Sequence, residues 1–354
     1  MIQEKIKFEE FDPLNGSEEE WATYHVFRRR RNQEVNPDDP ISSNESAMES
    51  IRASVQNPEA NIFLTNIFDT EKNQQIGEIM CATITDASPS FEGTKHLVQF
   101  DLFLLKEYRN QGIGTIALKR VYEFAKEKKK QILMTSAEEQ DGRTFLNKIG
   151  AQVALSGAEN RLQLEEVNWA MVETWAKEGQ KKSSETKLKS FTKIPENIVE
   201  EYCKVYTEVL NQQPLGDLDI GAMVITPEVY RTQEKMFEDL GRSWITFITM
   251  EPSGEISGLT EMRHNPNRKT MISQLLTGVQ ENHRGRGLGK WLKASMLLKI
   301  RETFPEVKTV TTGNATSNAP MLSINNRLGF KLYKETVGAQ ITLEQLGKYL
   351  QSKK

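Results

Sequence analysis

Apolar and polar residues alternate over residues 96–105 and again over 270–279, and a period of two predicts β-strands. A glycine-rich turn containing arginine follows each segment, and apolar side chains then return at helical spacing. The stripes are Leu118, Val121, Tyr122 and Ala125 in the first copy and Leu292, Met296, Leu297 and Ile300 in the second. We therefore expect one strand–turn–helix plan twice, with helices running to about residues 128 and 304.

The elements predicted around each copy also repeat. Two helices and two strands precede each strand–turn–helix plan, and a further strand and a short helix follow it. The expected ranges are 18–32, 44–56, 61–68, 75–85 and 131–136 in the first copy and 196–211, 227–240, 243–250, 255–262 and 309–313 in the second, with final helices ending at Gly150 and Gly329. This order predicts an α/β (α+β) domain, present twice, whose sheet is mostly an antiparallel meander.

A polar segment separates the two copies. Residues 177–187 are charged and lack large apolar side chains, which is typical of a linker. Residues 167–176 carry Trp169 and Trp175 and predict a helix that packs one domain against the other. We expect an N-terminal domain over 1–166, a helix and linker over 167–187, and a C-terminal domain over 188–354.

Composition narrows the class of protein. Apolar residues make up 37% and charged residues 27% of 354, as in globular proteins with real cores, and the net charge of −3 gives no general attraction to nucleic acid. The basic run at residues 28–31 is interpreted as a solvated helix face, with contact to an acidic substrate or nucleic acid as the alternative. Two distant cysteines, no N-terminal apolar signal and no apolar stretch of membrane-spanning length predict a cytoplasmic protein that does not bind membranes.

The turns at residues 109–115 and 284–290 carry the candidate chemistry. Their glycines let backbone N–H groups approach a ligand, and a helix that starts there adds unpaired N–H groups and partial positive charge. These features suit a diphosphate. Neither turn fits the P-loop, since Trp291 stands where that motif needs Ser or Thr, or the Rossmann fingerprint, which needs an early βαβ unit. A bland glycine turn is the remaining alternative.

The pattern [Q/R]-x-x-G-x-[G/A] after a strand resembles the GNAT acyltransferases, and residues 109–114 and 284–289 both match it. Leu104 and Val279 stand five positions before the first loop residue, where the family has an apolar strand residue. The family's closing Gly-Phe is present at residues 329–330, with a weaker Gly-Ala at 150–151. The resemblance covers nearly the whole chain and implies two GNAT-like domains, each a mixed, mostly antiparallel twisted sheet flanked by helices.

The resemblance implies acetyl-CoA, or another acyl-CoA, as co-substrate and an amine as acceptor. Loop amides would bind the diphosphate, the preceding strand would pair with pantetheine, and the backbone amide of Thr277 would polarise the thioester carbonyl. The implied cofactor-binding residues are Leu104, Arg109, Gln111, Gly112, Ile113, Gly114 and Thr115 in the first copy and Val279, Arg284, Arg286, Gly287, Leu288, Gly289, Lys290, Asn314 and Asn318 in the second.

The usual acid and base of the family are missing. Asn325 and Leu146 stand where many members have a tyrosine acid, and no glutamate stands at the usual position for the base. Glu261, placed at the end of a strand facing the site, is the best candidate base. The alternative is that Glu261 is only a solvated carboxylate at a strand end. Tyr333 is a weaker candidate acid, against a packed strand tyrosine. Asn318 is an equally good N-cap, and no metal site is expected because the histidines lack ligand spacing.

Three functions fit these residues. The leading hypothesis is an N-acyltransferase that moves an acetyl or other acyl group to a small-molecule amine by direct attack. The alternatives are a non-catalytic acyl-CoA binding module or sensor and a structural tandem whose loops are relics. The second copy, which keeps more of the family pattern, is expected to be the catalytic one, in a monomer or a homodimer.

Overall fold

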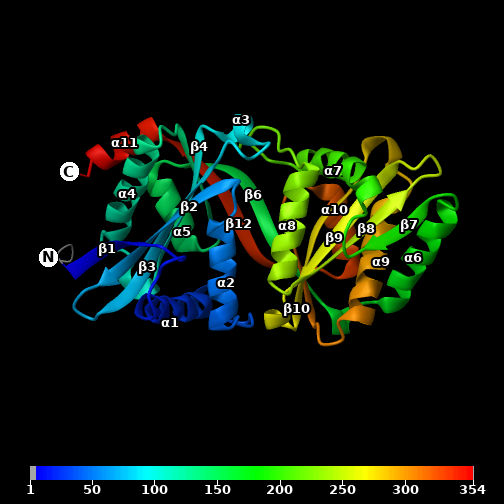
Figure 1. Ribbon diagram of the computed structural model, residues 1–354, viewed down its shortest axis with the longest axis horizontal. Coiled ribbons are helices and arrows are strands. Elements are labelled where there is room, and N and C mark those ends of the chain that lie inside the picture. The colour runs from blue at the N-terminus through cyan, green and yellow to red at the C-terminus, as the bar shows by residue number, and fades with distance from the viewer. Residues whose placement is uncertain (1–4, 354) are drawn as a thin grey trace. The chain divides into compact units, whose positions relative to one another are not determined.

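A computed structural model describes residues 5–353, so Met1–Glu4, where the absence of a signal sequence was inferred, and Lys354 lie outside it. The chain forms two compact units (Figure 1). The first unit comprises Met1–Leu155, Asp217–Gly221 and Val337–Lys354, and the second comprises Ser156–Gly216 and Ala222–Thr336. These units are compact in space and are not continuous in sequence. The predicted boundaries at 166 and 188 concern the sequence repeats and stay a prediction.

The first unit is a six-stranded sheet in the order β1-β2-β3-β4-β5-β12. Its last strand comes from the end of the chain, where residues 337–342 of β12 pair antiparallel with β5. The strands are β1 (Ile6–Phe11), β2 (Ala60–Asp69), β3 (Gln74–Ile84), β4 (Leu97–Leu104), β5 (Ile132–Ala137) and β12 (Lys331–Thr342). The helices are α1 (Glu18–Val35), α2 (Asn44–Val55), α3 (Phe91–Thr94), α4 (Ile113–Glu127), α5 (Gln140–Ile149) and α11 (Leu343–Gln351).

The second unit repeats this plan in the order β6-β11-β10-β9-β8-β7. Its strand next to β11 comes from the first half of the sequence, since residues 157–163 of β6 pair antiparallel with β11. The strands are β6 (Gln152–Gln163), β7 (Lys187–Phe191), β8 (Ser243–Met250), β9 (Ile256–His264), β10 (Met271–Val279) and β11 (Thr309–Ala315). The helices are α6 (Trp169–Lys182), α7 (Glu196–Asn211), α8 (Pro227–Asp239), α9 (Leu288–Thr303) and α10 (Ala319–Leu328).

One short parallel pair in each sheet positions the candidate site. Strand β4 pairs with β5 only where Leu97–Gln99 face residues 132–134. Strand β10 pairs with β11 only where residues 271–273 face 309–311. Beyond these three-residue registers the two strands of each pair separate. Their other partners are antiparallel. The predicted fold class is confirmed: each unit is a mixed, mostly antiparallel sheet flanked by helices.

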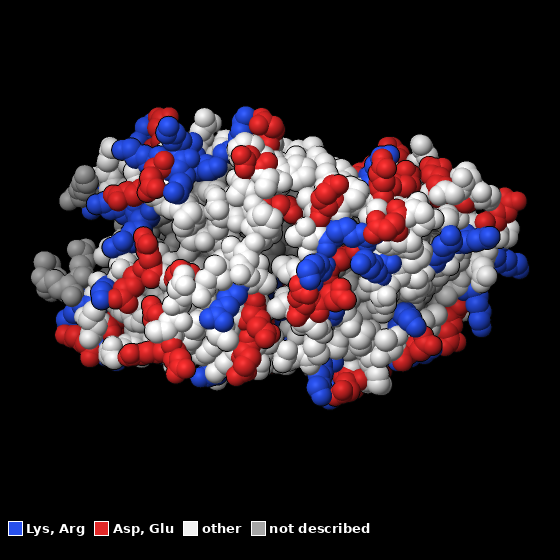
Figure 2. Space-filling view, in the orientation of Figure 1, with Lys and Arg blue, Asp and Glu red and all other residues white. Residues whose placement is uncertain are grey.

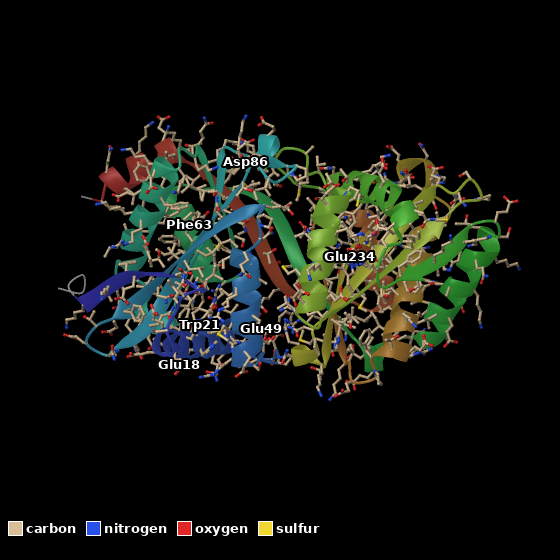
Figure 3. All side chains as sticks on the ribbon, in the orientation of Figure 1. Glu18, Trp21, Glu49, Phe63, Asp86 and Glu234 are labelled. Atoms are coloured by element: carbon tan, nitrogen blue, oxygen red, sulfur yellow. The ribbon has the colours of Figure 1, made fainter. Side chains whose placement is uncertain are left out.

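The first unit is held by an aromatic cluster around α1. A capping box on Ser17 and Glu20 fixes the start of this helix. Trp21, labelled in Figure 3, packs edge-on against Phe11 and Tyr24 with ring centroids 5.0 and 5.7 Å away. All three side chains are buried, so the helix is anchored to the sheet by large apolar area.

The second unit buries both faces of its sheet. In β8, every residue from Trp244 to Met250 is buried, as expected for a strand covered on both sides. Helices α7 and α8 cover one face, where Tyr202 and Tyr230 enter the core, and α9 covers the other, where it also packs on α6.

The expected linker is partly helical, which corrects that prediction. Helix α6 continues to Lys182, so only residues 183–186 separate it from β7. The polar residues 177–182 belong to a helix that packs on α9 of its own unit, and Gly179 lets the two helices approach closely. A Cβ built on Gly179 would lie 2.4 Å from Cγ of Trp291.

Acidic and basic side chains are mixed over the visible face of each unit (Figure 2). Among residues 5–353, no helix is both long enough and apolar enough to cross a membrane.

The Gly179–Trp291 contact gives a stability prediction. We expect Gly179→Ala to lower the free energy of unfolding by about 1–3 kcal/mol, because overpacking outweighs the helix propensity gained. Gly289→Ala on α9 is the control, since its Cβ would make an ordinary 3.5 Å contact and should be neutral or stabilising. Urea unfolding of both variants measures the difference, and equal stabilities would contradict the packing argument.

Candidate acyl-transfer site

Both glycine turns open a helix in the way the sequence predicts. Gly112 and Gly287 are the N-cap residues of α4 and α9, with φ of 85° and 84° in the left-handed region. Nothing lies within 4 Å of a Cβ built on either glycine, so backbone conformation rather than space favours glycine. Within residues 5–353, the N–H groups of Ile113 and Leu288 at the two helix starts donate to no acceptor, as is usual in the first turn of a helix.

Each turn is tied to the strand that precedes it by the same contact. Nε of Arg109 donates to the carbonyl oxygen of Leu104 at 2.9 Å, and Nε of Arg284 lies 3.4 Å from that of Val279. The structure thus brings each predicted strand residue to the first residue of its turn. This contact was not foreseen, although the five-residue spacing in both copies was the available signal.

A cavity of about 600 Å³ lies in the first unit between its glycine turn and the point where β4 and β5 separate. Helix α1 supplies Tyr24, Arg28 and Arg31 to its wall, and β4 supplies Asp101 and Leu104. The other lining residues are Phe27, Asn32, Val35, Asn36, Leu102, Phe103, Arg109, Asn110, Gly112, Gly114, Thr115, Ser136, Ala137, Glu138, Glu139, Asp141, Gly142, Phe145 and Lys148. The cavity therefore reaches from the predicted diphosphate seat to charged side chains of α1.

Carboxylates surround the arginine of the first turn. Arg109 lies 2.8 Å from Glu139, 3.1 Å from Asp141 and 3.8 Å from Glu34. Glu139 is the N-cap of α5, and Asn318 is the N-cap of α10 in the second unit. The two turns share backbone geometry but differ in charge, and an anion at the first turn must compete with three carboxylates.

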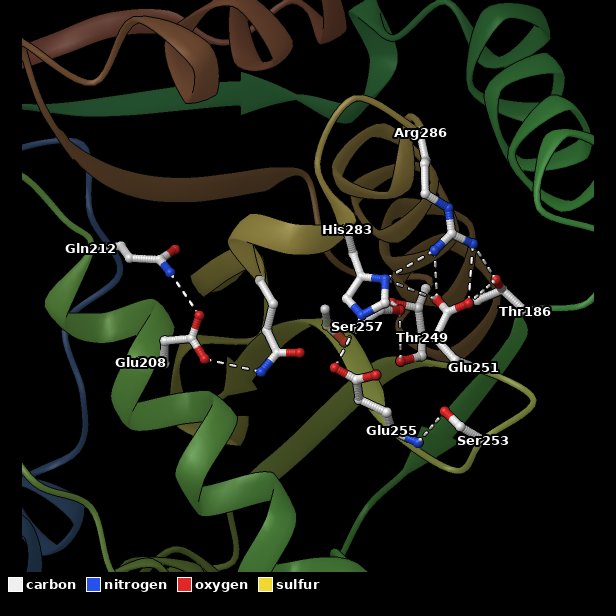
Figure 4. Close-up of polar contacts among 12 residues, drawn as sticks. Thr186, Glu208, Gln212, Thr249, Glu251, Ser253, Glu255, Ser257, His283 and Arg286 are labelled. Carbon is white, nitrogen blue, oxygen red and sulfur yellow. Dashed lines mark hydrogen bonds and ion pairs between the residues drawn. The ribbon is translucent and has the colours of Figure 1, made fainter.

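The arginines of the second turn have different partners. Arg284 donates to Oε1 of Gln212 at 2.6 Å, which is uncharged. Arg286 binds both carboxylate oxygens of Glu251 at 3.0 and 3.1 Å and also the hydroxyl of Thr186 (Figure 4). Burial of Glu251 opposes its ionisation, but the hydrogen bonds from Arg286 prevail and lower the pKa of this carboxyl.

His283 belongs to the same cluster. Its Nδ1 lies 3.1 Å from Arg286, its Nε2 lies 3.1 Å from Glu255, and its side chain is only 16% exposed. The turn is thus braced by the β8–β9 connection (Figure 4), while Gly287 and the helix start beyond it remain uncovered by these contacts.

Glu261 is fully buried in β9, so it is not a solvated strand-end carboxylate. The hydroxyl groups of Tyr202 and Tyr230 donate to its Oε1 at 2.5 and 3.0 Å. Burial raises the pKa of the Glu261 carboxyl, and the hydrogen bond from Tyr202 and the charge of Arg263 partly oppose the shift. A carboxyl with a raised pKa is a stronger base than an ordinary glutamate.

A second polar cluster lies on the α9 side of the same sheet. Lys293 is 1% exposed, and its Nζ donates to Oδ1 of Asn325 at 2.7 Å and to Oε1 of Gln274 at 3.2 Å. Nδ2 of Asn325 donates to Oδ1 of Asn314 at 2.7 Å. Burial lowers the pKa of Lys293 to about 7. Nothing in the sequence singles out this lysine, because it stands in an ordinary amphipathic pattern.

The other candidate residues, Thr277, Asn318 and Tyr333, lie on three different elements. Thr277 follows a register irregularity in β10, where the strand has left β11, and its hydroxyl lies 2.7 Å from that of Thr260. Asn318 caps α10 by accepting the N–H of Met321. Tyr333 lies on β12 with the guanidinium of Arg161 3.3 Å from its ring centroid. These are their places in the fold, and their roles stay predictions.

The first unit contains a charged cluster that sequence reasoning missed. Arg31 lies 2.7 Å from Asp101 and 3.1 Å from Glu78, which is itself buried in β3. Burial raises the pKa of Glu78, and Arg31 opposes the shift. The run 28–31 is therefore not a solvated face, since Arg28 and Arg31 line the cavity. A carboxylate within an apolar strand, as in Gly77–Ile79, was the signal available.

No group of three or more His, Cys, Asp or Glu side chains placed to hold a metal ion occurs in the part of the chain that the structure describes.

Comparison with known proteins identifies the fold. Residues 25–149 match the family model for the acetyltransferase (GNAT) family. None of the curated proteins compared with the chain matches it. Among solved structures, the chain is similar to a tandem GNAT protein from the clavulanic acid biosynthesis pathway, solved without AcCoA, at 18% identity and a TM-score of 0.75 over 96% of this chain and 98% of that one.

Two further structures share the architecture. One is a GCN5-related N-acetyltransferase from Sphaerobacter thermophilus, with 12% identity, a TM-score of 0.64 and 97% of each chain covered. The other is the N-myristoyltransferase of Saccharomyces cerevisiae with bound MyristoylCoA, with 9% identity, a TM-score of 0.55 and coverage of 95% of this chain and 82% of that one. At these identities the likeness concerns the fold.

The burial of Glu261 gives a pH-dependent stability prediction. Because the folded-state pKa is raised, the unfolded chain loses this proton first, near pH 4.3, and folding becomes less favourable as the pH rises towards the folded-state pKa. We expect the stability of Glu261→Gln relative to the native protein to increase from pH 4 to pH 7. Chemical denaturation at both pH values measures it, with Glu302→Gln on the surface as control, and a pH-independent difference would refute the argument.

Proposed function

We propose that this chain, which carries an acetyltransferase (GNAT) family domain over residues 25–149, transfers an acetyl or other acyl group from a coenzyme A thioester to the amine of a small molecule. The observation that carries the proposal is the same in both units. In each unit two strands separate after a three-residue parallel register, and the first of them leads through the glycine turn into a helix whose first N–H group has no acceptor, so a slot between strands is followed by a candidate anion site.

We assign the parts of coenzyme A to this slot as follows. The diphosphate of coenzyme A would bind at residues 111–115 or 286–290, and pantetheine would run along Leu104 or Val279 towards the separated strands. In the second unit this path leads to the irregular segment of β10, where the amide of Thr277 would hold the thioester carbonyl. Asn314 and Asn318 flank the other side of the slot from β11 and the start of α10.

The acceptor amine must lose a proton to form the amide. Glu261 is our candidate base in the second unit, because its buried carboxyl is held by Tyr202 and Tyr230 and has a raised pKa. In the first unit the corresponding candidate is Glu78, which pairs with Arg31; Arg31 and Asp101 line the cavity of about 600 Å³. Tyr333 remains a weaker candidate acid. We propose that an amine attacks the thioester directly and that coenzyme A leaves as the thiol.

A non-catalytic acyl-CoA sensor is the second candidate. Its support is that buried Asn325 and Leu146 occupy the positions where the family resemblance places a tyrosine acid. The two functions differ in turnover: a transferase releases free thiol when an amine is present, and a sensor binds acyl-CoA without releasing it.

A pair of isosteric substitutions at each turn tests the proposal and assigns the active unit. Asp and Asn both tolerate a left-handed conformation, so Gly287→Asp and Gly287→Asn differ in charge alone, as do Gly112→Asp and Gly112→Asn. At a turn that binds the diphosphate, we expect the Asp variant to bind acetyl-CoA about tenfold or more weakly than the Asn variant, a loss of about 1.4 kcal/mol.

Calorimetry with acetyl-CoA measures binding, and a thiol-release assay over a panel of amines measures turnover. Equal affinities of the Asp and Asn variants at both turns would sink the diphosphate assignment. Tight binding without thiol release from any amine would favour the sensor.

A further inference from the structure

Lys293 occupies an unusual place for a charged side chain. It lies in the middle of α9, in a helix whose neighbouring residues Leu292 and Ala294 are completely buried. Its Nζ makes two hydrogen bonds, both to side-chain amide oxygens. The ring of Phe330 lies 5.2 Å from Nζ and closes another side.

No carboxylate balances this charge among residues 5–353. The groups that face it are Gln274 from β10, Asn325 from α10, and Thr260 of β9 through Gln274, and none of them titrates. Glu261 and Arg263 follow Thr260 at odd spacing in β9 and lie on the opposite face. Elsewhere on α9 and α10, Lys290 and Arg327 stack on Trp175, and Arg301 pairs with Glu173.

A buried ammonium without a counter-charge is costly, and desolvation alone lowers the pKa of Lys293 to about 7. The side chain therefore passes between charged and neutral forms in the physiological range. An anion that entered nearby would stabilise the charged form.

The network around Lys293 bridges the slot. Gln274 directly follows the last residue of β10 paired with β11, and Asn314 lies three residues beyond the last paired residue of β11. From Thr277 the hydrogen bonds run through Thr260, Gln274, Lys293 and Asn325 to Asn314. A thioester held between β10 and β11 would lie against this chain of amides.

We propose that Lys293 is a positioning residue for acyl transfer in the second unit, stabilising the negative charge that develops on the coenzyme A sulfur by acting through Asn325. This inference rests on the proposed function. The amine nitrogen forms a bond to the acyl carbon, the carbon–sulfur bond breaks, and its electron pair passes to sulfur. The proton lost by the amine balances the proton gained by the thiolate, so no further reactant is needed.

The first test is the pH profile of kcat, measured in a Gly112→Asp background to silence the first turn. With Lys293 present, the rate should decline above about pH 7, where the ammonium is lost. Lys293→Met should lower kcat at pH 6 by about tenfold or more and abolish that decline. Lys293→Arg, which stays charged, should keep activity into the alkaline range. Lys299→Met, on the surface of the same helix, is the matched control.

The second test does not depend on turnover. In protein labelled with ¹³C at lysine Cε, an analogue of coenzyme A that carries a carboxylate in place of the thiol should raise the titration midpoint of Lys293 by about one pH unit relative to desulfo-coenzyme A, which carries no charge there. Equal midpoints with the two ligands, or a Lys293→Met profile that keeps the alkaline decline, overturn the role of Lys293. Failure of both ligands to bind the second unit overturns the proposed function there as well.

Discussion

The three residues over which β10 pairs with β11, and β4 with β5, are the constraint on which both sites depend. In each unit two parallel strands are joined by a helix. They are hydrogen-bonded to each other over their first residues and then separate. Separation leaves backbone groups of two strands without a partner, and the first of these strands then leads through its turn into a helix start that also has an unpaired N–H group. The slot and the proposed anion site therefore follow one another along the same segment in each unit.

Shared backbone geometry does not give the two units the same chemistry. At the first turn, Arg109 is surrounded by Glu34, Glu139 and Asp141, whereas Arg284 at the second turn meets neutral Gln212. The first unit has a cavity open to the Arg31 cluster, and the second has buried carboxyl and ammonium groups on opposite faces of its sheet. The two units therefore share a backbone arrangement but differ in the charged groups around it.

Burial is the physical origin of the unusual ionisation in the second unit. Glu261 is placed among tyrosine hydroxyls and Lys293 among amides, so each is hydrogen-bonded but neither is paired with an opposite charge at contact distance. Desolvation shifts the two pKa values towards each other, one upward and one downward. Such an arrangement costs stability.

The sequence by itself determined both turns and the elements that directly surround them. Period-two and helical patterns placed the strands before and the helices after each turn to within a few residues, because these patterns record which face of an element is buried. The glycines at 112 and 287 were readable because a left-handed N-cap favours glycine. Only the tertiary structure decided that β6 joins β11 and residues 337–342 join β5, since strand partners are chosen by long-range pairing that leaves no local pattern. It also decided that Glu261 and Lys293 are buried, because burial of a charge depends on what packs over it from distant segments.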